Sequence, residues 1–381
     1  MSTMERILRL MADKQASDVY LTAHAPAQIR IHGQCVPINQ QVLPPDAPRK
    51  LLAEIVPHDR LVEFDRTGEL NMGHAVEGLG NFRISALRQR GTCAVVVRFI
   101  PPVIPALSTL NLPAVLADLV VERRGLVLMA GSTGSGKSTT LAAMLDLRNE
   151  LMPGHILTIE DPIEFIFQHK RSVVNQREVG ADTESLEVAL RNGLRQAPDV
   201  ILIGEIRDAA TMSAALAYAQ SGHLVMATLH ANNSYQALHR ILSFFPEQVR
   251  PILLGDLAAT LRAVVSQRLL RNRAGGRVPA VEVMLNTQRV AELIGAGDFT
   301  AVKEAMEKSM AEGSQTFEQD IARLIATGAV DQAEGLAHCD SASNLLWRLQ
   351  NDFSTPAPSG PAEDPDDVPS FTEITLDVKP S

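Results

Sequence analysis

The chain has 381 residues and a formal net charge of −9, with 45% apolar and 21% charged residues. This length is typical of two or three domains, and the acidic balance disfavours a free-standing nucleic-acid binder. No apolar run reaches the ~18–20 residues that span a bilayer. The three cysteines lie far apart and form no CxxC pair, so they indicate neither a zinc site nor a disulfide framework. We therefore expect a reducing, cytosolic compartment.

The first hundred residues predict a small α+β domain. Apolar residues at helical spacing between positions 4 and 11 indicate an opening amphipathic helix. The further elements expected are strands at 19–21 and 28–31, a helix at 48–56, and strands within 69–100, among them 81–87 and 92–99. Four prolines between positions 101 and 113 then indicate a stiff linker.

A different pattern begins near residue 120. Short apolar runs alternate with helical segments, which is typical of a parallel sheet covered on both faces. The expected strands are 126–130, 156–159, 200–203 and 224–228. From residue 245 to about 350 the sequence predicts mostly helix. The last segment, 354–381, has six prolines, six acidic residues and one lysine, and we expect a disordered acidic tail or a solvated extension without a role.

Residues 131–138 fit the phosphate-loop pattern G-x-x-x-x-G-K-[ST] at every fixed position, between an apolar strand and a helix. Glycines let successive N–H groups turn toward phosphate oxygens, and the helix N-terminus adds partial positive charge. We expect Lys137 to reach the β- and γ-phosphates of ATP and the Ser138 hydroxyl to ligate Mg²⁺. The predicted nucleotide-binding residues are Gly131, Ser132, Thr133, Gly134, Ser135, Gly136, Lys137, Ser138 and Thr139. The alternative is a glycine-rich turn that binds nothing.

Acidic residues follow two of the predicted strands. Glu205 comes after the apolar run 200–203 and Gly204, the pattern of the second motif of P-loop NTPases, where a carboxylate can hold Mg²⁺. Glu160, Asp161 and Glu164 end another strand, where clustered carboxylates can orient a metal or deprotonate the attacking water. The candidate metal ligands are therefore Ser138, Glu205, Glu160 and Asp161. The alternative for 160–164 is a solvated acidic turn.

Two histidines, His223 and His230, bracket the strand at 224–228. A lone histidine is more often structural than catalytic, but an imidazole at the carboxyl end of a strand could sense the γ-phosphate. Their odd separation puts them on opposite faces of a strand, so we expect different roles for them.

Several segments in this order resemble the motifs of the secretion-superfamily ATPases, and among these most of all the type IV pilus retraction ATPases PilT and PilU. The matching segments are 131–138 (Walker A), 158–165 (Asp box), 194–201 and 204–208 (Walker B) and 222–230 (His box), with 17–21 near the start. The resemblance covers roughly residues 3–350.

The resemblance implies an α/β protein with a PAS-like N-terminal domain (1–100), a linker (101–119) and a RecA-like ATPase domain with a helical C-terminal part (120–353). It also implies a homo-hexameric cytoplasmic motor, peripheral to the inner membrane at the pilus base, which powers or assists pilus retraction and twitching motility. The implied partners are a PilT-type ATPase and the inner-membrane platform protein. Direct nucleic-acid binding is not expected, and membrane association is expected through partners only.

The resemblance also assigns roles to single residues. Glu164 matches the glutamate proposed as general base, and Glu205 matches the Walker B glutamate that supports Mg²⁺. Arginines of the family complete the site of a neighbouring subunit, because developing γ-phosphate charge needs a guanidinium that can arrive in trans. The matching positions are Arg83 and Arg98 in the N-terminal domain and Arg191, Arg195 and Arg207 in the C-terminal domain. We interpret Arg191 as a member of a surface ion pair rather than as a residue that completes a neighbouring site.

The sequence departs from the family patterns in several places. It cannot build the tetracysteine insert of assembly-type relatives, which favours the retraction branch. Residues 261–267 match the retraction motif of PilT only partly, whereas 310–317, 344–349 and the acidic tail look more like PilU. An accessory role beside PilT is therefore possible.

Other function classes remain as alternatives. The chain could be an accessory paralogue that binds a PilT-type ring and contributes mainly contacts, or a related secretion or assembly ATPase. A GTPase would need N-K-x-D, and an ABC ATPase would need an L-S-G-G-Q-type signature; both are missing from the sequence. A DNA-translocating ring receives no support from the net charge.

Overall fold

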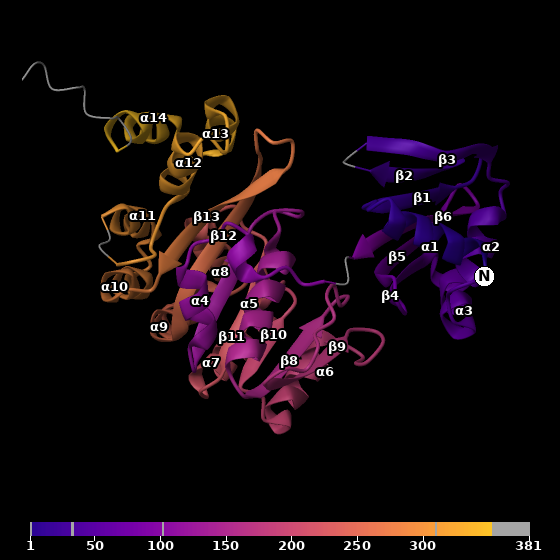
Figure 1. The fold of residues 1–381 in the computed structure, drawn as a ribbon. Helices are drawn as coiled ribbons and strands as arrows, with labels where there is room; N and C mark the ends of the chain where they lie inside the picture. Colours follow the sequence, from indigo (N-terminus) through magenta and orange to yellow (C-terminus); the bar gives the residue numbers. More distant parts are fainter. Residues whose placement is uncertain (1, 32–33, 101–102, 309–310, 353–381) are drawn as a thin grey trace, which may run out of the picture.

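The computed structural model describes residues 2–31, 34–100, 103–308 and 311–352, and these residues form two β-sheets with helices (Figure 1). The predicted acidic tail, 354–381, lies outside the described residues. In the described part of the chain, every helix is too short or too polar to cross a membrane.

The N-terminal unit is an antiparallel sheet whose inner face is covered by helices. Its strand order is β3-β2-β1-β6-β5-β4. The strands are β1 (Asp18–Thr22), β2 (Pro26–Ile31), β3 (Gln34–Val42), β4 (Glu69–Val76), β5 (Gly80–Gln89) and β6 (Thr92–Ile100), and the helices are α1 (Thr3–Asp13), α2 (Ala47–Ala53) and α3 (His58–Thr67). A capping box between Ser2 and Glu5 starts α1. Leu8, Phe82 and Val97 are fully buried between the sheet and these helices.

The second sheet has seven strands in the order β13-β12-β7-β11-β10-β8-β9. They are β7 (Gly125–Ala130), β8 (Gly154–Glu160), β9 (Ser172–Glu178), β10 (Val200–Ile203), β11 (Leu224–Leu229), β12 (Leu261–Arg271) and β13 (Arg277–Leu285). All neighbouring pairs are parallel except β12 and β13, which form an antiparallel hairpin. The carboxyl ends of the parallel strands therefore meet along one edge of the sheet.

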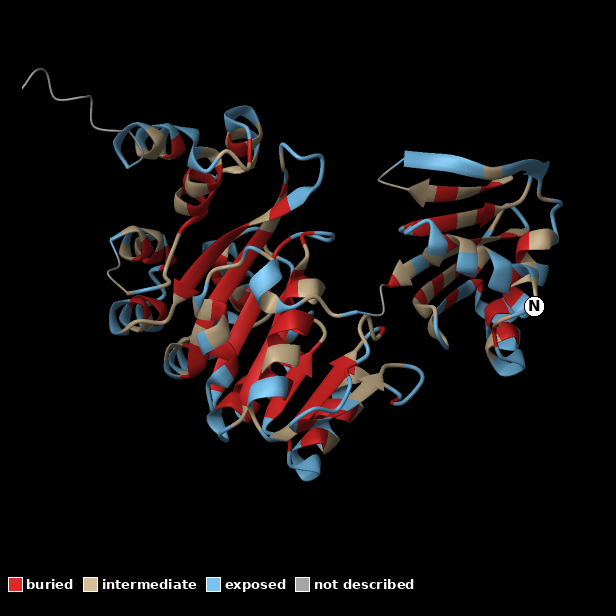
Figure 2. Ribbon diagram, in the orientation of Figure 1, coloured by how far each residue is buried: buried red, intermediate tan, exposed pale blue. Residues whose placement is uncertain are grey.

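Helices cover both faces of this sheet, and the strands between them are buried (Figure 2). They are α4 (Val115–Val121), α5 (Lys137–Leu151), α6 (Leu186–Gly193), α7 (Ala209–Gln220), α8 (Ser234–Ser243) and α9 (Arg250–Thr260), with short 3₁₀ turns η1 (Leu107–Thr109), η2 (Leu194–Gln196) and η3 (Glu247–Val249). Every residue of β7 and β11 is buried, as expected for parallel strands covered on two sides.

The C-terminal part is helical and packs partly on the β12–β13 hairpin. Its helices are α10 (Gln288–Ala296), α11 (Phe299–Glu307), α12 (Phe317–Ala326), α13 (Gln332–His338) and α14 (Ala342–Asn351). The predicted α/β class and helical C-terminal part are confirmed. The expectation of helix from residue 245 onward is wrong for 261–285, because a buried strand shows no alternation that separates it from a buried helix.

Candidate nucleotide site

The phosphate loop connects β7 to α5 and is built on glycines. Gly131, Gly134 and Gly136 all have positive φ, in the region that side chains rarely adopt. A Cβ on Gly131 would lie 2.4 Å from Ser135 Oγ, and a Cβ on Gly136 would lie 2.6 Å from the Nε2 atom of Gln267. The backbone can therefore close around an anion only with glycine at these positions.

Lys137 is the buried cation of this loop. Its Nζ donates hydrogen bonds of 2.7 and 2.9 Å to the carbonyl oxygens of Gly131 and Ser132. Burial lowers the pKa of Lys137, and the negative charges of Glu205 and Glu164 act in the opposite direction. The carboxylates of Glu205 and Glu164 therefore lie close enough to Lys137 to favour its charged form.

One buried polar atom of the same loop has no hydrogen-bond partner within the described residues. This atom is the Oγ of Ser135. Buried hydroxyl groups are rarely left unpaired, and a phosphate oxygen in the loop would supply the missing acceptor. The phosphate loop therefore fits the nucleotide phosphates that the sequence implies.

An ion-pair cluster joins the carboxyl ends of three adjacent strands. After β10, Glu205 lies 2.7 Å from the Nε atom of Arg207 through Oε2 and 3.1 Å from His230 Nε2 through Oε1. Arg207 also lies 3.5 Å from the carboxylate of Asp161, which follows β8. Four residues named from the sequence are therefore in contact at the edge that carries the phosphate loop.

Glu160 has a different environment from the other candidate acids. Its carboxylate accepts hydrogen bonds from Thr158 Oγ1 (2.7 Å) and Gln176 Nε2 (3.2 Å). Burial raises the pKa of Glu160, and the charge of Glu164 raises it further. Because a metal ligand must be ionised and accessible, the geometry favours Glu205 over Glu160 for that role.

The donor set for a metal at this site is small. The described part of the chain contains no group of three His, Cys, Asp or Glu side chains that could hold a metal ion by themselves. Ser138, which lies in the first turn of α5, and Glu205 offer the hard oxygen ligands that Mg²⁺ prefers. This set fits a Mg²⁺ ion that is held largely by nucleotide phosphates and water.

Gln267 on β12 was not identified from the sequence as a site residue. Its side chain is buried; Nε2 donates to the carbonyl oxygen of Ser135 (2.8 Å), and Oε1 accepts from Thr140 Oγ1 (2.8 Å). It therefore ties the phosphate loop and the first turns of α5 to the neighbouring strand. A strand prediction for 261–271 would have placed it beside the loop.

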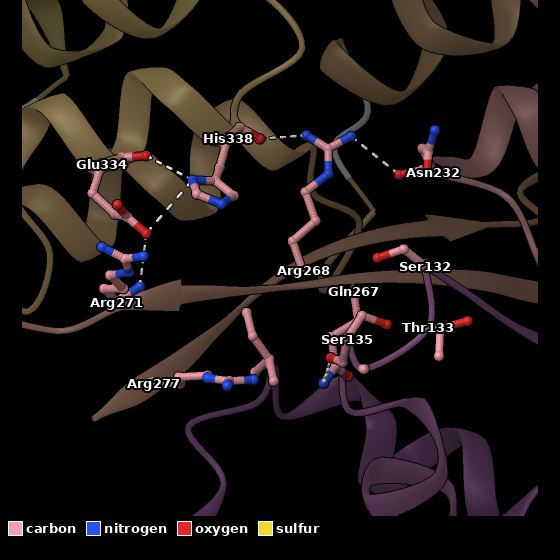
Figure 3. A pocket seen from close by; sticks show the side chains of 12 residues that line it. Ser132, Thr133, Ser135, Asn232, Gln267, Arg268, Arg271, Arg277, Glu334 and His338 are labelled. Carbon is pink, nitrogen blue, oxygen red and sulfur yellow. Dashed lines mark hydrogen bonds and ion pairs between the residues drawn. The ribbon is translucent and has the colours of Figure 1, made fainter. Parts of the chain in front are cut away.

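A cavity of about 550 Å³ adjoins the phosphate loop (Figure 3). Its walls come from loop residues 132–135 and from side chains of β12, β13 and α13. Arg268 donates to the carbonyl oxygens of Asn232 (3.1 Å) and His338. The other polar side chains of these elements are Gln267, Arg271, Arg277 and Glu334. The cavity is therefore polar and lies directly beside the phosphate loop.

His223 and Arg195 lie away from the phosphate loop of their own chain. The carbonyl oxygen of His223 accepts from Gly125 N at the start of β7, and Arg195 lies in η2, before the amino end of β10. Both are thus at the end of the sheet opposite the phosphate loop. Of the two histidines, His230 contacts Glu205 in the acidic cluster, whereas His223 lies at the opposite end of the sheet.

The remaining candidate arginines lie on the surface. Arg191 forms the predicted exposed ion pair, 2.6 Å from Glu187. Arg83 and Arg98 are paired in register on β5 and β6, on the sheet face opposite the buried core. Asp18, which is 3% exposed, holds the Nε atom of Arg98 at 3.0 Å. Both arginines are therefore displayed on one face of the N-terminal sheet.

Comparison with known proteins agrees with this architecture. The profile of the family described as type II/IV secretion system protein matches residues 4–336. The chain belongs to this family. It is 43% identical to the type IV pilus ATPase PilU of Pseudomonas aeruginosa over 98% of this chain and 96% of that protein. It is 37% identical to the PilT retraction ATPase of the same organism over 86% of this chain and 95% of that protein.

A solved structure extends this agreement to the fold. The crystal structure of the pilus retraction motor PilT with bound ADP superposes with a TM-score of 0.84 at 36% identity, over 91% of this chain and 99% of that one. The predicted resemblance to the PilT and PilU family is confirmed. The similarity includes both the N-terminal unit and the unit that carries the phosphate loop.

Proposed function

We propose that this protein is an ATP-hydrolysing motor that powers or assists type IV pilus retraction and hence twitching motility. The proposal rests mainly on Lys137, which is buried within the phosphate loop and whose pKa is lowered by burial against the opposing effect of the negative charges of Glu205 and Glu164. The PilU and PilT relatives, which match nearly their whole length, support the assignment to pilus retraction.

The chemistry assigned to the site follows from these residues. Lys137 faces the β- and γ-phosphates and offsets the charge that develops there. Glu164 orients or deprotonates the attacking water, and Glu205 and Ser138 would hold Mg²⁺, which neutralises phosphate charge when bound. Arg207 and His230 hold the Glu205 carboxylate from two sides, so they position it rather than contact the nucleotide.

The proposal includes assembly into a homo-hexamer. Arg83 and Arg98 would reach the nucleotide of a neighbouring copy, and their display on the open face of the N-terminal sheet supports this. Residues 1–100 and 120–353 would then act as two domains joined by 101–119. The ring would lie in the cytoplasm at the inner-membrane base of the pilus, in contact with the platform protein and without binding nucleic acid directly.

An accessory role remains the second candidate function. In this role the chain joins a PilT-type ring or docks on it and contributes mainly protein–protein contacts. The similarity to PilU over 98% of the chain favours a function that requires a PilT-type partner. The complete set of Lys137, Glu164 and Glu205 favours turnover by the chain itself.

Steady-state ATP hydrolysis with and without a purified PilT-type protein, itself made inactive by replacing its phosphate-loop lysine with alanine, separates the two candidates because all turnover then belongs to this chain. The assembly state is measured in the same samples by light scattering. Turnover by a lone hexamer supports the self-sufficient motor. Turnover only in the mixture supports the accessory role, and the absence of turnover in both contradicts the proposed function.

A further inference from the structure

The edge strands of the two sheets meet in this structure. β4 is an edge of the N-terminal sheet, and β9 is an edge of the large sheet. Gly73 on β4 donates its backbone N–H to the Oε1 atom of Glu178 on β9, at 3.2 Å. A side-chain carboxylate of one sheet therefore binds the backbone of the other.

The second oxygen of the same carboxylate binds the loop that carries Glu164. Glu178 Oε2 accepts a hydrogen bond of 3.1 Å from the backbone N–H of Ile163, the residue immediately before Glu164. One carboxylate thus bridges the N-terminal unit and the loop of the proposed general base. Both distances lie at the long end of the range for N–H···O hydrogen bonds, so each end of the bridge is an ordinary hydrogen bond.

Arg60 strengthens the same junction. This residue of α3 donates from Nη1 to the carbonyl oxygen of Gly180 (3.1 Å) and from Nη2 to that of Asn71 (3.0 Å). Gly180 lies just beyond β9 and Asn71 lies on β4. The guanidinium therefore spans the two edges beside Glu178.

The bridge leaves little room for a side chain at position 73, so a Cβ there would push the Glu178 carboxylate aside. A Cβ there would lie 2.9 Å from Glu178 Oε2 and 3.5 Å from Oε1. The φ angle of Gly73 is not in the left-handed region, so alanine could adopt the backbone conformation without strain. An added methyl group would therefore disturb the bridge specifically and leave the strand intact.

We propose that Glu178 is a positioning residue that couples the placement of the N-terminal unit to the conformation of the loop carrying Glu164. When the N-terminal unit is docked, the Gly73 N–H fixes one carboxylate oxygen and thereby aims the other at Ile163. When the unit swings away, Glu178 loses this restraint, and the loop gains freedom. The effect on catalysis rests on the proposed function, but the mechanical coupling does not.

Gly73→Ala tests the coupling without altering the acidic loop itself. We expect backbone hydrogen exchange in the segment 161–167 to quicken by about fivefold, the factor for loss of one ordinary hydrogen bond. We also expect kcat to fall with little change in KM, because the phosphate loop is untouched. Gly255→Ala on α9, where a Cβ meets no atom within 4 Å, is the matched control and should change neither quantity.

A double-mutant cycle with Glu178→Gln completes the test. Glutamine keeps the size of the side chain but replaces one acceptor oxygen with a donor group, so one end of the bridge is lost. In that background Gly73→Ala should have little further effect on exchange at 161–167. Additive effects, or a Gly73→Ala variant that exchanges at 161–167 like the wild type, would overturn the proposal.

The exchange measurement uses the full chain without nucleotide, so it is independent of ATP hydrolysis. A wild-type chain that does not hydrolyse ATP would contradict the proposed function, while non-additive exchange would still support the coupling. Normal hydrolysis together with additive exchange would contradict the coupling alone.

Discussion

Gln267 donates a hydrogen bond from Nε2 to the carbonyl oxygen of Ser135, 132 positions earlier in the sequence. Its Oε1 atom accepts from the Thr140 hydroxyl, so both ends of the buried amide are paired. The strand β12 therefore determines where the phosphate loop lies relative to the cavity beside it. This side chain, together with Lys137, therefore helps to fix a glycine-rich loop that has little intrinsic stiffness.

Gln267→Leu should loosen the phosphate loop. The substitution leaves the Ser135 carbonyl and the Thr140 hydroxyl buried without their partner, at a cost of about 1–3 kcal/mol for each unsatisfied group. We expect a lower midpoint of thermal unfolding and weaker nucleotide binding, measured by calorimetry. The exposed Gln332→Leu serves as the control. Unchanged stability and nucleotide affinity in Gln267→Leu would contradict the role assigned to the amide.

Glu205→Gln should separate nucleotide binding from hydrolysis. The carboxylate lies between Arg207 and His230, and its loss removes the proposed metal support while the phosphate loop stays intact. We expect nucleotide binding to persist and kcat to fall by about 10²-fold or more. Glu187→Gln, which breaks only the exposed pair with Arg191, should retain full activity. Normal turnover of Glu205→Gln would transfer the metal role to Asp161 or Glu164.

Two of the three thiols, Cys35 and Cys93, should differ in reactivity. Cys35 is exposed, whereas Cys93 is buried and burial raises its pKa to about 11. Because the thiolate is the reactive form, maleimide labelling at pH 8 should modify Cys35 quickly and Cys93 only after unfolding. A raised pKa also means that the neutral Cys93 thiol contributes stability below pH 9, and this contribution falls as the pH rises toward 11.

Mass spectrometry of labelled peptides, with Cys35→Ser as the control, checks this prediction. The control should remove the fast phase of labelling and leave the slow one unchanged. Fast modification of Cys93 in the folded chain would show that the packing of β6 in the N-terminal unit is looser than described.

The sequence predicts the chemistry of the site well because phosphate binding restricts residue types strongly. Only glycine adopts the backbone of positions 131 and 136, and only a long cation fits at Lys137, so the motif can be identified without a structure. The parallel strands could be predicted for a related reason. Strands buried on both faces are continuously apolar, and their carboxyl ends bring Glu205, Asp161 and His230 together.

The contributions of β12 and β13 could not be predicted in the same way. A buried hairpin late in an otherwise helical segment has no alternating pattern, so the sequence predicts mostly helix around Gln267 and the cavity arginines. The bridge between Gly73 and Glu178 escapes prediction for a different reason. It joins two sheet edges that are 105 positions apart, and nothing local in either strand signals the contact.

We propose that the chain hydrolyses ATP with the lysine of its phosphate loop. The most direct measurement is steady-state ATP turnover by the purified wild type and by Lys137→Ala, with Lys50→Ala as an exposed lysine control. We predict turnover by the wild type and by Lys50→Ala, alone or with a hydrolysis-deficient PilT-type partner, and loss of activity in a folded Lys137→Ala chain. Near-normal hydrolysis by Lys137→Ala would contradict the account.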